Sequence, residues 1–157
     1  MTIDRDIRTG RAIGAGRRPT GPVASFVLIV GAALLVTSAV IHLHLWASGY
    51  RYIPTIGPLF FVQGVLGIIL TLLIALTRRA FIAVIGALFA AGTLAGLLVS
   101  VHIGLFGHRT AMGAPWALTS AVIEGAAVVV LCSGAALAVS IERAHIRRWR
   151  SYKAPTP

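Results

Sequence analysis

Two short segments place a histidine and an arginine at the same spacing. His44 and Arg51 fit the pattern H-x4-G-x-R, and His102 and Arg109 fit it again later in the chain. Histidines at matching depth on diagonal helices could ligate haem iron from both sides, and the arginines could bind its propionates through charge-assisted hydrogen bonds. The pattern therefore raises a haem b site as one hypothesis. The simpler interpretation is that both histidines hydrogen bond to neighbouring backbone at a membrane surface.

Another histidine, His42, lies two residues before His44. Two residues correspond to about 200° around a helix, so the side chains of His42 and His44 point in different directions. We therefore do not expect these two histidines to bind a single ion. Because His44 has a counterpart in His102, it is the stronger candidate of the two.

Each histidine–arginine pair is followed by an apolar run that carries one polar residue before a glycine, Gln63 in one run and Glu124 in the other. Glu124 is the only acid in any of the apolar runs. A bare charge in a bilayer costs at least ~2.5–3.5 kcal/mol, so Glu124 must be paired, protonated or hydrated. It is either a proton-carrying or ligand-binding group, with a quinone as one candidate ligand, or half of a buried structural pair.

The distribution of charge predicts the fold class. Of all residues, 57% are apolar and only 11% are charged, and the mean hydropathy is +0.90. Charge is almost absent from four long intervals, each exceeding the ~20 residues that cross a bilayer core. We therefore predict an all-α membrane protein, a bundle of four transmembrane helices at about 23–46, 58–77, 80–105 and 115–141. A basic N-terminal segment, 1–20, and a basic tail, 142–157, flank a transmembrane domain over 21–141.

The repeated pattern also suggests that the bundle is built from two hairpins. The histidine, arginine, proline and polar residue recur in the same order in both halves of the chain. Two such hairpins would have the same orientation and be related by an axis along the membrane normal, which is a parallel repeat. Residues near that axis are natural candidates for a binding site.

The cations predict the orientation of the helices. Of the 14 lysines and arginines, only Arg51 and Arg109 fall in the first and third connections. The others lie in the terminal segments or at Arg78 and Arg79, so the positive-inside rule places both termini in the cytoplasm of a bacterial plasma membrane. These basic segments favour anionic lipids at the cytoplasmic face. Since orientation already accounts for the charge, we expect no nucleic-acid partner.

The stretch H-L-H-L-W-A-S-G-Y-R-Y-I-P-T-I-G-P-L-F, residues 42–60, resembles a group of small four-helix integral membrane proteins of actinobacteria. That group has no assigned activity, so the resemblance implies a location in a bacterial plasma membrane and no catalytic residue. The chain also lacks nucleotide-binding, hydrolase and zinc-protease motifs. Its one cysteine, Cys132, excludes a cysteine-based metal centre.

These observations favour a non-enzymatic accessory or binding subunit with a polar pocket in the outer half of the bundle. Its partners would include the lipid bilayer and either a larger membrane complex or further copies of the chain. One alternative is a redox membrane protein that binds haem b or a quinone. The other is a small-solute or proton transporter that uses Glu124. The candidate ligand-binding residues are His44, Arg51, Gln63, His102, Arg109 and Glu124.

Overall fold

The structure, a computed structural model, describes residues 20–153. Most of the basic N-terminal segment and the last four residues of the tail therefore lie outside the described residues. The described chain folds into α1 (Pro22–Ala47), a 3-10 turn η1 (Tyr50–Tyr52), α2 (Ile56–Thr77), α3 (Ala80–His102) and α4 (Ala117–Lys153). All four α-helices are long and apolar enough to cross a membrane. The predicted all-α fold class with four spans is confirmed.

The observed helix ends have local causes. Proline fixes the backbone angle φ and lacks an N–H group, so Pro22 suits the first turn of α1. α3 ends at His102, shortly before Gly104, which has φ +94°. α4 extends well beyond the predicted end at 141, because no proline interrupts residues 117–153. The described part of the basic tail therefore continues the last transmembrane helix.

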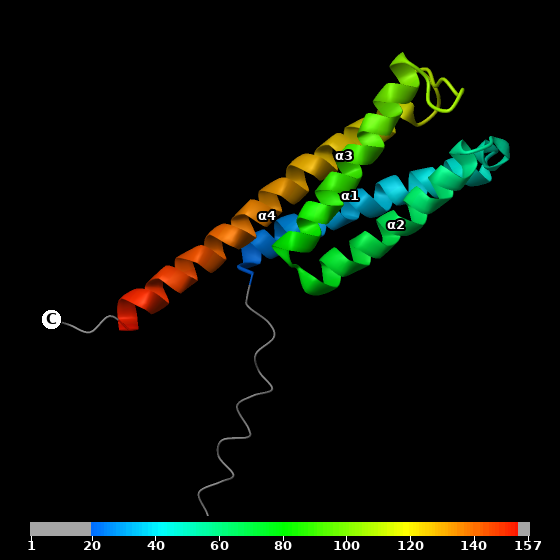
Figure 1. Cartoon of the computed structure of the whole chain (residues 1–157). Helices are drawn as coiled ribbons and strands as arrows, with labels where there is room; N and C mark the ends of the chain where they lie inside the picture. Colours follow the sequence, from blue (N-terminus) through cyan, green and yellow to red (C-terminus); the bar gives the residue numbers. More distant parts are fainter. Residues whose placement is uncertain (1–19, 154–157) are drawn as a thin grey trace, which may run out of the picture.

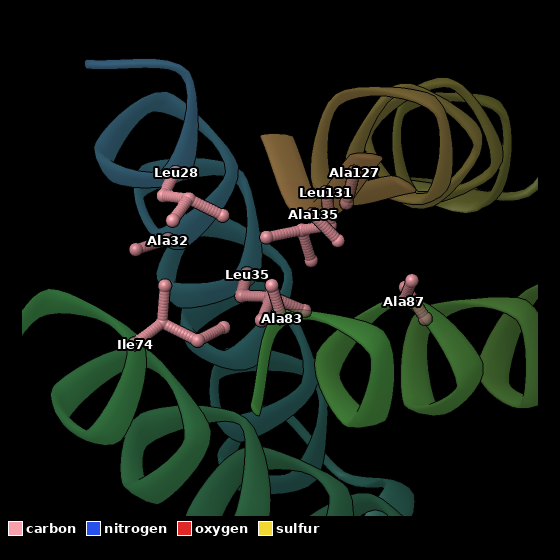
Figure 2. Packing of buried hydrophobic residues seen from close by; sticks show 10 residues of the cluster. Leu28, Ala32, Leu35, Ile74, Ala83, Ala87, Ala127, Leu131 and Ala135 are labelled. Carbon is pink, nitrogen blue, oxygen red and sulfur yellow. The ribbon is translucent and has the colours of Figure 1, made fainter. Parts of the chain in front are cut away.

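α1 and α4 form the central pair of the bundle. α1 packs extensively against α2 and α4, and α4 packs equally closely against α3. α1 and α3 scarcely touch, so they lie diagonally, as the haem hypothesis assumed. Figure 2 shows the apolar core where the helices meet, with Leu28 and Leu35 of α1 beside Leu131 of α4 and Ile74 of α2.

Glycines allow close approach of the helices in this core. A Cβ atom on Gly31 of α1 would collide with the side chain of Leu131 of α4, and one on Gly134 of α4 would lie 2.8 Å from Leu28 of α1. In lipid, helices gain little from the hydrophobic effect and associate largely through such close packing. Gly92 of α3 differs, because a Cβ atom there would meet nothing within 4 Å.

α2 and α3 separate from each other soon after their short connection. Arg78 ends α2 in the left-handed conformation, with φ 51°, and α3 begins at Ala80. From this turn α2 follows α1 while α3 follows α4, and the two diverge (Figure 1). The α1–α2 and α3–α4 connections therefore lie together at one end of the bundle, and the described chain ends lie at the other. We call the end with the two connections the connection end.

The α1–α2 connection depends on a glycine at the start of α2. A Cβ atom on Gly57 would lie 2.8 Å from the carbonyl oxygens of Tyr50 and Arg51. Such a contact with backbone atoms is not relieved by rotating a side chain. The glycine in the I-P-T-I-G-P stretch thus allows the 3-10 turn to pack directly on α2.

We expect the substitution Gly57→Ala to lower the free energy of unfolding by about 1–3 kcal/mol, the usual cost of overpacking. Gly92→Ala is the matched control, because it adds the same methyl group to open space and helix propensity favours alanine. Reversible unfolding in mixed detergent micelles measures both. Equal stability of the two variants would show that the packing at Gly57 is unimportant.

Candidate functional site

Buried residues on α1 and α4 continue from the apolar core into a polar region nearer the connection end. On α1 the buried positions Leu35, Ser38 and His42 follow one another at three- and four-residue steps. On α4 the buried positions Ser120 and Glu124 follow the same spacing. This spacing keeps side chains on one face of a helix. The contact between α1 and α4 therefore changes from apolar to polar along its length.

Glu124 is the centre of this polar region. Its side chain is almost fully buried, with 1% exposed. The hydroxyl of Ser38 donates a hydrogen bond to Glu124 Oε1 over 3.1 Å. The ring of His42 lies on the same side, with Nε2 3.7 Å from Oε1. The acid that the sequence singled out is thus held by two residues of α1.

The geometry of His42 determines how this pair carries charge. Its Nδ1 lies 2.8 Å from the carbonyl oxygen of Ser38, which can only accept a hydrogen bond, so Nδ1 carries a proton. If neither Nε2 of His42 nor Glu124 held a proton, the lone pair of Nε2 would face a negatively charged carboxylate. Two arrangements avoid this repulsion: imidazolium with carboxylate, and imidazole with carboxylic acid. Both states are neutral overall and share one proton, which lowers the cost of burial.

The second oxygen of Glu124 has no such support. Oε2 is buried and has no hydrogen-bond partner among the described residues. Glu124 lines a cavity of about 150 Å³ towards the connection end, formed by residues of all four helices. The other polar lining residues are His42, Tyr50, Gln63, Thr93, Ser100, His108, Thr110 and Ser120. The carboxyl group thus lines a cavity while one of its oxygens remains unsatisfied.

Aromatic residues cover the cavity at the connection end. The ring of Tyr50 stacks on Phe60 of α2, with centroids 5.0 Å apart. The same tyrosine and His108, from the α3–α4 connection, form an edge-to-face pair with centroids 5.8 Å apart. A further hydrogen bond of 3.1 Å joins Ser100 of α3 to Thr110. The two connections therefore meet above the cavity, and we call Tyr50, Phe60 and His108 the aromatic cover.

Of the six residues predicted to bind a ligand, Gln63 and Glu124 line this cavity and the other four do not. Arg51 lies over the ring of Tyr52, 4.8 Å from its centroid. Arg109 turns back to α3 and donates a hydrogen bond of 3.0 Å to the carbonyl of His102. Both arginines thus make contacts next to the cavity rather than inside it.

The two histidines of the repeated pattern are exposed. His44 packs edge-to-face against Trp116, 5.8 Å between centroids. His102 Nδ1 lies 2.9 Å from the carbonyl of Leu98 on its own helix. The contact of His102 matches the simpler interpretation, a histidine bonded to neighbouring backbone, whereas His44 makes a ring contact instead. The haem hypothesis therefore stays a prediction that this geometry does not support.

Reasoning from the sequence missed the contribution of His42 and Ser38. The repeated pattern drew attention to His44, which is exposed and does not line the cavity. The useful signal was the spacing of Ser38 and His42, which are four residues apart on one face of a helix. The small and apolar residues that precede them on this face form the core of α1. This face could have been matched to Ser120 and Glu124, which show the same spacing on α4.

A double-mutant cycle tests the coupling of His42 and Glu124. His42→Phe leaves the carboxyl group without its neighbour, so it should destabilise the protein more when Glu124 is present than when it is glutamine. We expect a coupling free energy of about 0.5–3 kcal/mol, the usual range for residues of one network. His44→Phe, two residues away and exposed, should change stability by less than about 0.5 kcal/mol. Additive effects of His42→Phe and Glu124→Gln would contradict the pairing.

No protein-family model, curated protein or solved structure matches this chain. The site is therefore defined by the contacts of the chain alone. The described residues form a bundle of four helices, each long and apolar enough to cross a membrane, with a buried, half-satisfied carboxyl group lining a cavity.

Proposed function

We propose that this protein is a non-enzymatic binding protein of the membrane, which holds a small molecule in the cavity at Glu124. The observation that carries the proposal is Glu124 Oε2, a buried acceptor without a partner among the described residues. A buried polar atom left unpaired costs about 1–3 kcal/mol, and more for charged groups. A ligand that donates a hydrogen bond to Oε2 would recover this cost.

The lining of the cavity indicates what such a ligand looks like. Glu124 of α4 and Gln63 of α2 offer polar contacts, while Phe60, Leu59 and Leu97 supply apolar surface. Because the His42–Glu124 pair can be neutral overall, the ligand need not be an ion. A small, largely apolar molecule with one hydrogen-bond donor fits best.

Thermal unfolding in detergent tests this function with small probes. Phenol, tert-butanol and tert-butylamine each carry a donor, and benzene carries none. At concentrations well above Kd, at least one probe that carries a donor should raise Tm more than benzene does, because a ligand that binds the folded state stabilises it. The substitution Glu124→Gln should remove this preference, whereas Glu142→Gln, an exposed carboxylate on the same helix, should preserve it. If no donor-bearing probe shifts Tm more than benzene, the proposed binding function is wrong.

We also propose that the chain sits in a bacterial plasma membrane with both termini in the cytoplasm. Arg78 and Arg79 mark the turn between α2 and α3, and Arg143 and Arg147 lie on the extension of α4. Only Arg51 and Arg109 lie in the connections at the other end. This asymmetry supports the orientation that the positive-inside rule predicts, with the cavity in the outer half.

Single cysteines test the orientation in a background in which Cys132 is replaced by serine. Ser48→Cys places a thiol in the α1–α2 connection, and Thr77→Cys places one at the end of α2. A membrane-impermeant maleimide should label Ser48→Cys in intact cells and label Thr77→Cys only after the cells are permeabilised. The reverse pattern would show that the protein is inserted the other way round.

A further inference from the structure

The size of the cavity limits what it can hold. Its volume is about 150 Å³, whereas pockets that enclose a whole drug-sized ligand measure about 300–1,000 Å³. An apolar cavity of about 150 Å³ is known to hold one benzene ring. The cavity therefore fits one ring, and a larger ligand must leave part of its structure outside.

The rings around the cavity favour an aromatic occupant. The face of Phe60 already stacks with Tyr50, and its ring meets His42 edge-on, with centroids 5.3 Å apart. Aromatic rings in such surroundings gain offset and edge-to-face contacts beyond simple burial. With Glu124 Oε2 as acceptor, the best fit is a ring that carries a hydroxyl group, which is a phenol.

The aromatic cover lies across the end of the cavity that faces the connections. Tyr50 contacts both Phe60 and His108, and the backbone of His108 forms a reciprocal bridge with Leu105. Leu105 also lines the cavity. A ligand arriving along the bundle axis would have to displace these contacts. The connection end is therefore the less favourable route of entry.

The side of the cavity between α2 and α3 is more open. Leu59 and Gln63 of α2 and Gly96 and Leu97 of α3 line it, yet Leu59 is 38% exposed and the other three are only partly buried. A Cβ atom on Gly96 would meet nothing within 4 Å. The glycine thus leaves space at the cavity wall. In a membrane this side of the four-helix bundle faces lipid.

We propose that the cavity takes the ring of a phenolic lipid, whose hydroxyl donates to Glu124 Oε2 and whose chain passes between α2 and α3 into the bilayer. This inference rests on the proposed binding function and names its ligand class and route. Each part of the ligand meets matching surroundings. The hydroxyl meets a hydrogen-bond acceptor, the ring meets aromatic side chains, and the alkyl chain meets lipid. No chemical change of the ligand is required.

The test compares phenol with 4-decylphenol, using the full chain in lipid nanodiscs. Protein-free nanodiscs correct for partition of the decyl probe into lipid. The substitution Gly96→Phe fills the space beside the cavity, and Gly92→Phe adds the same ring one helical turn away, also in open space and outside the cavity lining. Circular dichroism and thermal unfolding confirm that both variants fold, and Gly96→Ala serves as a smaller change if the phenylalanine variant does not.

We expect Gly96→Phe to weaken or slow binding of 4-decylphenol by about tenfold or more. Gly92→Phe should leave the binding of this probe within about twofold of the unsubstituted protein. A tenfold loss of affinity corresponds to about 1.4 kcal/mol. Glu124→Gln should weaken both phenols. If Gly96→Phe and Gly92→Phe weaken binding of 4-decylphenol equally, or if neither does, the proposed route between α2 and α3 is wrong. If tert-butanol binds in a Glu124-dependent way and neither phenol does, the phenolic ligand is wrong while the binding function stands. If no donor-bearing probe binds, both fail.

Discussion

The connection half of this bundle is organised around the burial of one carboxyl group in an apolar surrounding. A charge at the centre of a bilayer costs several kcal/mol unless it is paired or neutralised. Glu124 avoids most of that cost because α1 brings a hydroxyl group and an imidazole to the same oxygen. The contact between α1 and α4 must therefore be close and correctly phased. Gly31 and Gly134 make it so, because each accommodates a leucine of the other helix.

The bundle has two halves with different packing. Near the α2–α3 turn, Ile74 of α2 and Ala83 of α3 join the leucines of α1 and α4 in a continuous apolar core (Figure 2). Towards the connection end, α2 and α3 diverge, and the space between the helices is lined by polar and aromatic groups. The tight half holds the helices in register. The open half can then keep a cavity without loss of the overall fold.

The sequence predicted the four helices well, because uncharged intervals long enough to cross a bilayer rarely occur in chains that fold in water. It also identified Glu124, the only acid in those intervals, and Gln63, its counterpart in the other half. It did not identify His42, because a short repeated pattern favoured the exposed His44. Which histidine faces inwards depends on how α1 is rotated against α4, and glycine contacts between distant parts of the chain determine that rotation. The aromatic cover likewise arises from two connections whose conformations have no periodic signature.

The state of Glu124 also bears on whether its role is structural. A buried pair that only fixed the helix register would gain most if both carboxyl oxygens were satisfied, since partly satisfied buried networks are less stable than complete ones. A suitable hydroxyl is near at hand on Thr93, which lines the same cavity. Thr93 lies close enough to interact with Glu124, but the one proton of its hydroxyl is donated to the carbonyl of Ala90 on its own helix, over 2.9 Å. The chain thus supports one oxygen of Glu124 fully and leaves the other beside a cavity, and this asymmetry is why we propose a binding role rather than a purely structural pair.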